Sequence, residues 1–111
     1  MTRIYVFRRE EGIELLAWGH ADYAEAGQDI VCAGVSALLY GFKAYLERQS
    51  LLCEGGRINP AEWDGGLWLR TKGFGGMDET AWEVTRAGLE LIIRQYPQCV
   101  FLEEENLCRE E

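Results

Sequence analysis

Two residues of this sequence could together carry out nucleophilic chemistry: Cys32 and His20, the only histidine of the chain. Asp29 is a typical helix N-cap, which predicts a helix directly after it with Cys32 at its third position. The N–H groups and the positive dipole end of a helix N-terminus stabilise a thiolate, and a histidine could take the thiol proton and return it. Spacing alone leaves a structural role open for both residues.

Two further polar residues accompany the cysteine on the predicted helix. Spacings of three and four residues place Asp29, Cys32 and Ser36 on one face. Asp29 has two interpretations, as a cap alone or also as a partner that orients the His20 imidazole. Ser36 either hydrogen-bonds near the thiolate or bonds the backbone of its own helix.

The segment from His20 to Gln28 is predicted as a loop between two glycines. Gly19 and Gly27 flank it, and they either act as hinges or adopt positive φ in turns. The residues between them are mostly small or polar, which gives an empty loop little to anchor it. We therefore expect this loop to become ordered over bound substrate.

A longer pattern runs through these residues. It reads Gly19-His20-Ala21 and then Gly27-Gln28-Asp29-Ile30-Val31-Cys32-Ala33-Gly34-Val35-Ser36. This pattern resembles the motif of the ribosomal-processing cysteine protease (Prp) family of Firmicutes and related bacteria. Gly34 departs from the motif, because the family usually has alanine there. Glycine costs about 1 kcal/mol in a helix interior, so the departure concerns local stability and removes no catalytic group.

The resemblance implies a cysteine endopeptidase with Cys32 as nucleophile and His20 as base. Its substrate would be large-subunit ribosomal protein twenty-seven, whose N-terminal extension is cut after an apolar stretch ending in two phenylalanines. Such an extension needs an apolar groove, and the candidates for its walls are Trp18, Tyr23, Phe74 and Met77. The resemblance also implies a homodimer, to which three aromatics could contribute: Trp63, Trp68 and Trp82.

Two other functions stay open beside this one. The first is a phage-type protease that processes capsid or scaffold proteins. The second is a non-catalytic protein-binding module that uses its acidic surface to hold a basic partner.

The composition restricts the partners. The net charge of −8 over 111 residues argues against direct contact with nucleic acid or an anionic membrane. It suits a basic partner such as a ribosomal protein precursor, although solubility explains it as well. One histidine and four cysteines without a close pair make a metal site unexpected, and nothing implies a cofactor. We expect a cytoplasmic protein with reduced thiols, without an export signal or a segment long enough to span a bilayer.

The hydrophobic pattern predicts one α+β domain over residues 1–111, with a mostly antiparallel sheet and two helices packed on one face. Strands are expected at 3–9, 13–18, 51–54, 57–63, 67–72 and 99–102, and helices at 29–48 and 78–95. In the second helix, Val84, Ala87 and Leu91, and in part Gly88 and Ile92, are expected to face the core. An acidic tail beginning at Glu103 is expected to fray.

Overall fold

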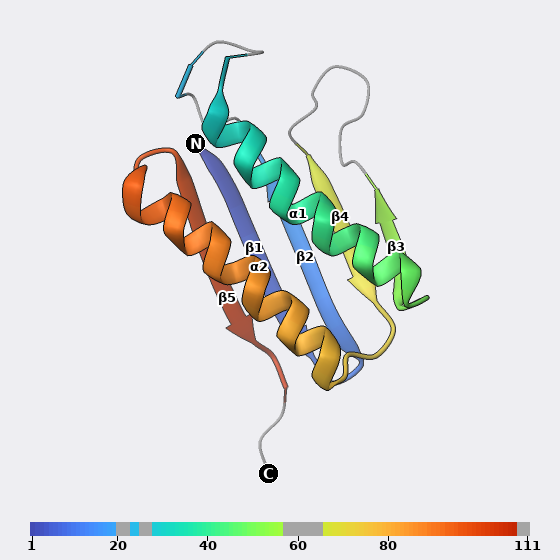
Figure 1. Cartoon of the computed structure of the whole chain (residues 1–111). Helices are drawn as coiled ribbons and strands as arrows, with labels where there is room; N and C mark the ends of the chain where they lie inside the picture. The colour runs from blue at the N-terminus through green and yellow to red at the C-terminus, as the bar shows by residue number, and fades with distance from the viewer. Residues whose placement is uncertain (20–22, 25–27, 57–65, 109–111) are drawn as a thin grey trace.

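The computed structural model describes residues 1–19, 23–24, 28–56 and 66–108, with the backbone alone at 53–56. These residues form a five-stranded sheet and two helices that lie across one face of it (Figure 1). The sheet is mostly antiparallel, so the predicted α+β architecture is confirmed. In chain order the elements are β1 (Thr2–Arg9), β2 (Gly12–Trp18), α1 (Ile30–Arg48), β3 (Leu52–Gly56), β4 (Leu67–Thr71), α2 (Gly76–Gln95) and β5 (Val100–Asn106).

The strand order in the sheet is β3-β4-β2-β1-β5. Strands β1 and β2 form the predicted hairpin, β4 pairs antiparallel with β2, and β3 pairs antiparallel with β4. Strand β5 runs parallel to β1, and a parallel pair needs a crossover, which α2 provides. This topology gathers the start of β1, the end of β2 and the start of α1 at one end of the sheet (Figure 1).

The core lies between the sheet and the helices. Alternate strand residues point toward the helices, and Ile4, Val6, Leu15 and Leu69 are fully buried there. Each such side chain stabilises the fold by about 1.5–3 kcal/mol when buried. Helix α1 covers them with the predicted stripe of apolar residues at three- and four-residue steps, of which five are buried: Val31, Val35, Leu39, Phe42 and Leu46.

Glycines allow the two helices to approach each other closely. A Cβ atom on Gly88 of α2 would lie 2.9 Å from the Leu38 side chain, and a Cβ atom on Gly34 of α1 would lie 3.3 Å from Ile92. Gly34 is the position that departs from the family motif. Its missing side chain makes room for Ile92, and this contact offsets part of the helix-propensity cost of glycine.

Helix α1 is apolar on more than its buried face. By length and composition alone Ile30–Arg48 could cross a membrane, so the prediction that no segment reaches that length was wrong. A core helix passes the same test, and the apolar stripe of α1 packs against the sheet. Burial accounts for this stripe, but only 28% of the apolar window is buried, and Ile30, Ala33 and Ala37 lie on the exposed side of α1.

The predicted core face of α2 was wrong for Val84, Ala87 and Leu91 and right for Gly88 and Ile92, which pack toward α1. Val84 and Leu91 are 68% and 55% exposed, whereas Trp82 and Leu89 are fully buried. The large indole decides the rotation of the helix, because its burial removes more apolar area from water than that of smaller residues. The same burial excludes Trp82 from a dimer interface.

Strand β5 extends beyond its predicted end. Glu103 to Asn106 pair with β1 and do not fray. Glu104 points to the helix side, where its carboxylate accepts hydrogen bonds from Arg8 Nε at 2.8 Å and from Trp82 Nε1 at 2.9 Å. These donors satisfy the charge and allow an acidic segment to continue as a strand. The strand predicted at 57–63 lies outside the described residues.

Candidate active site

The start of α1 carries the candidate nucleophile. Asp29 is the N-cap of the helix, and its Oδ1 accepts a hydrogen bond from the backbone N–H of Cys32 at 2.8 Å, as predicted. Cys32 is therefore the third helical residue, and it is half-buried. The cap occupies the Cys32 amide, whereas the amides of Ile30 and Val31 have no hydrogen-bond partner among the described residues, which leaves them for a negatively charged oxygen.

A crevice of about 340 Å³, including its open mouth, lies beside Cys32 between α1 and the strand ends. Its lining comes from β1, β2, α1 and the start of β4, and most of it is apolar or small. This lining suits an apolar side chain of a ligand that is held next to the thiol. The residues around it are Thr2, Ala17, Gly19, Cys32, Val35, Ser36, Leu39, Tyr40, Gly66 and Leu67.

Tyr23 lies at the same end of the molecule. Its backbone N–H donates to Asp29 Oδ2 at 3.1 Å, and the Ala24 N–H donates to the same oxygen at 3.5 Å. The Tyr23 ring meets Tyr96 edge-on, with ring centroids 5.1 Å apart. Of the four residues proposed for the groove, Tyr23 is the one that the structure places beside the start of α1.

Gly19 fixes the chain at the end of β2. Its φ of +102° belongs to a region that favours glycine, and a Cβ atom would lie 2.3 Å from the Met1 carbonyl oxygen. The Gly19 carbonyl also accepts a hydrogen bond from Thr2 Oγ1 at 3.4 Å. No other residue fits this position without moving the start of β1, so glycine here is a structural requirement.

Of the remaining predicted catalytic and supporting residues, Ser36 is described by the structure. Ser36 lines the crevice one turn after Cys32, on the face that the spacing predicts. His20 and Gly27 lie outside the described residues, so the geometry of the predicted Cys32–His20 pair stays a prediction.

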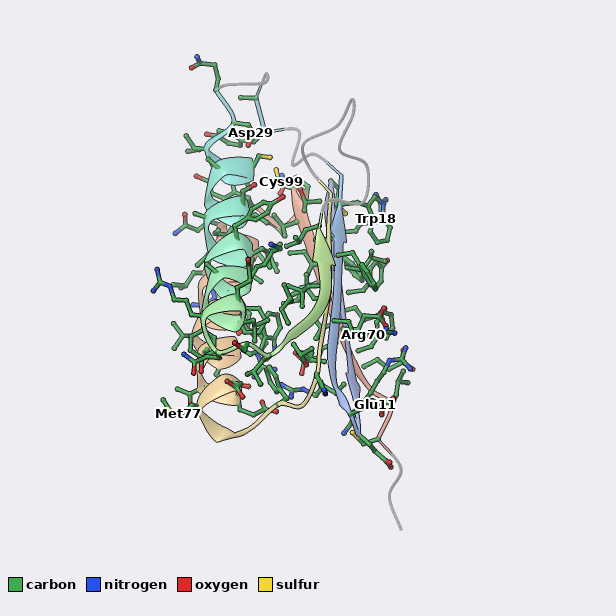
Figure 2. All side chains as sticks on the ribbon, turned by 90° about the vertical axis from the view of Figure 1, so that its right-hand side faces the viewer. Glu11, Trp18, Asp29, Arg70, Met77 and Cys99 are labelled. Carbon is green, nitrogen blue, oxygen red and sulfur yellow. The ribbon has the colours of Figure 1, made fainter. Side chains whose placement is uncertain are left out.

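Three of the groove candidates lie away from Cys32. Trp18 lies on the uncovered face of the sheet, and Met77 lies at the end opposite Asp29 (Figure 2). Phe74 packs edge-on against Phe42 at a centroid distance of 6.4 Å. Phe42 is ten residues beyond Cys32 on α1, which corresponds to about 15 Å of helix.

The crevice also contains residues that the sequence did not point to. Thr2, Ala17 and Leu67 belong to three strands, and each is an ordinary strand residue in the sequence. Tyr96, the C-cap of α2, reaches this end through its contact with Tyr23. Only the sheet order brings these segments together, so no local signal in the sequence could have identified them.

A capped helix start that presents a cysteine beside an apolar crevice fits an enzyme that uses a thiol as nucleophile. The family model described as cysteine protease Prp matches residues 1–101. The chain belongs to this family and is therefore a cysteine protease.

Relatives and solved structures agree with this assignment. The chain is 29% identical over 92 residues to the ribosomal processing cysteine protease Prp of Mycoplasma genitalium, which covers 83% of this chain and 88% of that protein. It is 70% identical over 43 residues to Prp of Staphylococcus aureus, covering 37% and 41%. The structure of S. aureus Prp with a covalently linked product peptide superposes with a TM-score of 0.79 at 22% identity, covering 94% and 99% of the two chains. At that identity the superposition shows a shared fold.

Proposed function

We propose that this protease removes the N-terminal extension of large-subunit ribosomal protein twenty-seven by a Cys–His mechanism. The observation that carries the proposal is the placement of Cys32 in the first turn of a capped helix, beside an apolar crevice. The relatives reported above are bacterial enzymes named for ribosomal processing. Their names favour a ribosomal protein over the phage capsid or scaffold protein as substrate.

In the proposed mechanism, the Cys32 thiolate attacks the scissile carbonyl carbon, and His20 takes the thiol proton. The carbonyl oxygen becomes an oxyanion, which the amides of Ile30 and Val31 stabilise. Collapse of this intermediate breaks the peptide bond, and His20 protonates the leaving amine. Water then hydrolyses the thioester, which releases the extension with a new C-terminal carboxylate and regenerates the thiol.

The crevice supports an aromatic or aliphatic residue next to the scissile bond. Leu39 and Leu67 form walls of it, and Ala17 leaves space between them. Burial of an apolar substrate side chain there provides binding energy that orients the carbonyl toward Cys32. The described lining contains no charged side chain, so an acidic residue at this substrate position would lose its hydration without gaining a partner.

Mass spectrometry of two peptides tests this specificity. One peptide carries the apolar extension with its two phenylalanines, and the other has both phenylalanines replaced by aspartate. We expect a single cut after the aromatic pair in the first peptide and none in the second. Equal cutting of both peptides, or cutting elsewhere, would contradict the proposed substrate.

We further propose a homodimer in which the uncovered faces of two sheets pack together. Tyr5 stacks on Trp18 with centroids 5.2 Å apart and meets Phe101 at 5.9 Å, so aromatic rings gather on this face. Trp68 lies on it as well and donates its indole N–H to Glu14 at 2.8 Å. Aromatic side chains are enriched in protein interfaces, and packing of two sheets would bury these rings.

Sedimentation velocity of two charge-inserting variants tests this interface. Phe101→Glu places a carboxylate on the sheet face and should give a monomer. Val84→Glu places one on the exposed side of α2 and should leave the dimer intact. A monomeric wild-type protein, or dissociation by Val84→Glu alone, would contradict the proposal.

The net negative charge of the chain supports a basic protein as substrate. Electrostatic attraction would act on such a substrate at long range, whereas the crevice acts only on contact. Bacterial ribosomes assemble in the cytoplasm, so we propose that the enzyme acts there, where its thiol stays reduced. A steep fall in the rate of precursor cleavage as salt is added would support this electrostatic contribution.

A further inference from the structure

The carboxylate of Asp29 makes more contacts than a helix cap requires. One oxygen, Oδ1, accepts the Cys32 N–H and completes the cap. The other oxygen, Oδ2, accepts the backbone N–H groups of Tyr23 at 3.1 Å and Ala24 at 3.5 Å. A single side chain therefore joins the helix that carries the nucleophile to a segment that lies five and six residues earlier in the chain.

Capping and the helix dipole favour an aspartate at this position, but neither requires its second oxygen. Serine and asparagine cap helices about as well, and each does so with one oxygen. A carboxylate also places a negative charge near the site where the thiolate forms, and like charges repel. The second oxygen gives aspartate a role that the other caps cannot fill. Asparagine has no second acceptor atom, and the serine side chain is too short to reach two segments.

Tyr23 is held a second time through its side chain. The edge-on contact with Tyr96 attaches it to the end of α2, while its backbone is attached to the start of α1. Edge-on aromatic pairs stabilise beyond the area that they bury. Residues 23–24 are thus anchored to both helices, three residues after His20 in the sequence.

We propose that Asp29 is a positioning residue, which through Oδ2 fixes the backbone of residues 23–24 relative to Cys32. This inference rests on the proposed cysteine protease mechanism, since it assigns Asp29 a part in aligning the chain that follows the general base. Asp29 touches neither the substrate nor the reacting atoms in this role.

Two cap-retaining variants separate positioning from capping. Asp29→Asn replaces Oδ2 or Oδ1 by an amide nitrogen that cannot accept, and Asp29→Ser keeps a single short acceptor. Both should melt within about 2 °C of the wild type, because the cap survives. Both should lower kcat for the extension peptide roughly tenfold with KM changed less than about twofold, as expected when one aligning hydrogen bond is lost. Asp29→Ala, which loses the cap too, should also melt earlier.

Hydrogen exchange of the Tyr23 and Ala24 amides gives a reading that does not depend on cleavage. We expect both amides to exchange faster in Asp29→Asn and Asp29→Ser than in the wild type, with the amides of β1 unchanged. If the wild type does not cut the peptide, the proposed function fails and this measurement alone decides the role of Asp29.

Two results would overturn the inference. One is unchanged exchange and unchanged kcat in both cap-retaining variants. The other is a fall in melting temperature in both variants as large as that in Asp29→Ala, which would reduce Asp29 to a cap.

Discussion

The two ends of the sheet are stabilised by different means. At the end near the β1–β2 turn, ion pairs and buried aromatic rings connect β1, α2 and β5. Among the described residues at the end that carries Cys32, the connections include a helix cap, a glycine contact, the edge-on Tyr23–Tyr96 pair and backbone hydrogen bonds. The comparison indicates that the stability of the fold and the chemistry of the site reside at opposite ends, so that changes at one end can spare the other.

We call the end of the sheet near the β1–β2 turn the distal end, and its hydrogen bonds and ion pairs the distal network. Glu104 is the centre of this network. It accepts hydrogen bonds from Arg8, Trp82 and Arg86, and Arg8 also pairs with Glu79. Burial opposes ionisation of Glu104, but the hydrogen bonds from Arg8 and Trp82 and the charges of both arginines outweigh it, which holds the pKa of Glu104 below its usual value.

At the end that carries Cys32, the capping carboxylate lies near the surface and a crevice lies among the apolar residues. Asp29 is only half-buried, and the crevice beside Cys32 leaves Leu39 and Leu67 with empty space on one side. An open space costs packing energy, because its lining atoms lack partners. The cross-links at the distal end compensate for that loss within the same sheet.

The largest expected effect comes from removing the buried indole of the distal end. Trp82→Ala should lower the free energy of unfolding by about 3–5 kcal/mol, because it leaves a large cavity and removes a donor to Glu104. Urea unfolding measures this. The kcat of the molecules that stay folded should change less than twofold, and a larger loss of kcat would contradict the separation of the two ends.

A substitution of Gly19, at the end that carries Cys32, should cost less stability and more activity than Trp82→Ala. Gly19→Ala forces a Cβ atom against the Met1 carbonyl at a positive φ, which should cost about 1–3 kcal/mol. Because this residue directly precedes His20, peptide cleavage should fall at least tenfold. The rate of cleavage and the melting temperature are measured together, and an unchanged cleavage rate would contradict this assignment.

The distal network should also make stability depend on pH. The lowered pKa of Glu104 means that its contribution is present above its unfolded value, near 4.5, and is lost as the pH falls through the folded value. Glu104→Gln should therefore lower the melting temperature most at neutral pH and progressively less between about pH 5 and 3.

Glu105→Gln is the matched control on the same strand, since Glu105 is exposed. Its melting temperature should follow that of the wild type at every pH. A Glu104→Gln deficit that stays constant from pH 7 to 3 would show that the ionised carboxylate is not the stabilising group.

The smallest expected effect is a gain in stability. Gly41 lies on the exposed side of α1, and a Cβ atom there meets nothing within 4 Å. Gly41→Ala should raise the free energy of unfolding by about 0.5–1 kcal/mol through helix propensity, without changing cleavage. Thermal unfolding checks this, and destabilisation would mean that the exposed face of α1 is covered in solution.

Much of the fold was predictable because its periodicity is local. The alternation in β1 and β2, the capped start of α1 and the apolar stripe from Val31 to Leu46 can all be recognised in the sequence. The rotation of α2 and the length of β5 could not be predicted, since both depend on Trp82 and Glu104 meeting across the fold.

In the candidate site too, features with a local sequence signal could be predicted, and features that depend on the folded sheet could not. The residues around Cys32 correctly predicted the helix start and the Asp29 cap, because a cap acts over three residues. The groove walls were predicted from apolar character alone, and Trp18, Phe74 and Met77 lie away from Cys32. The crevice beside Cys32 is lined by α1 and by residues of three strands that adjoin only after the sheet forms.

The most direct test of the central claim uses the full ribosomal protein precursor with wild-type enzyme and Cys32→Ala. Intact-mass spectrometry follows the precursor over time. We expect the wild type to produce one shortened protein and one released extension, and the variant, folded to the same melting temperature, to produce neither. Cleavage by Cys32→Ala at the wild-type rate would contradict the assignment of Cys32 as the nucleophile.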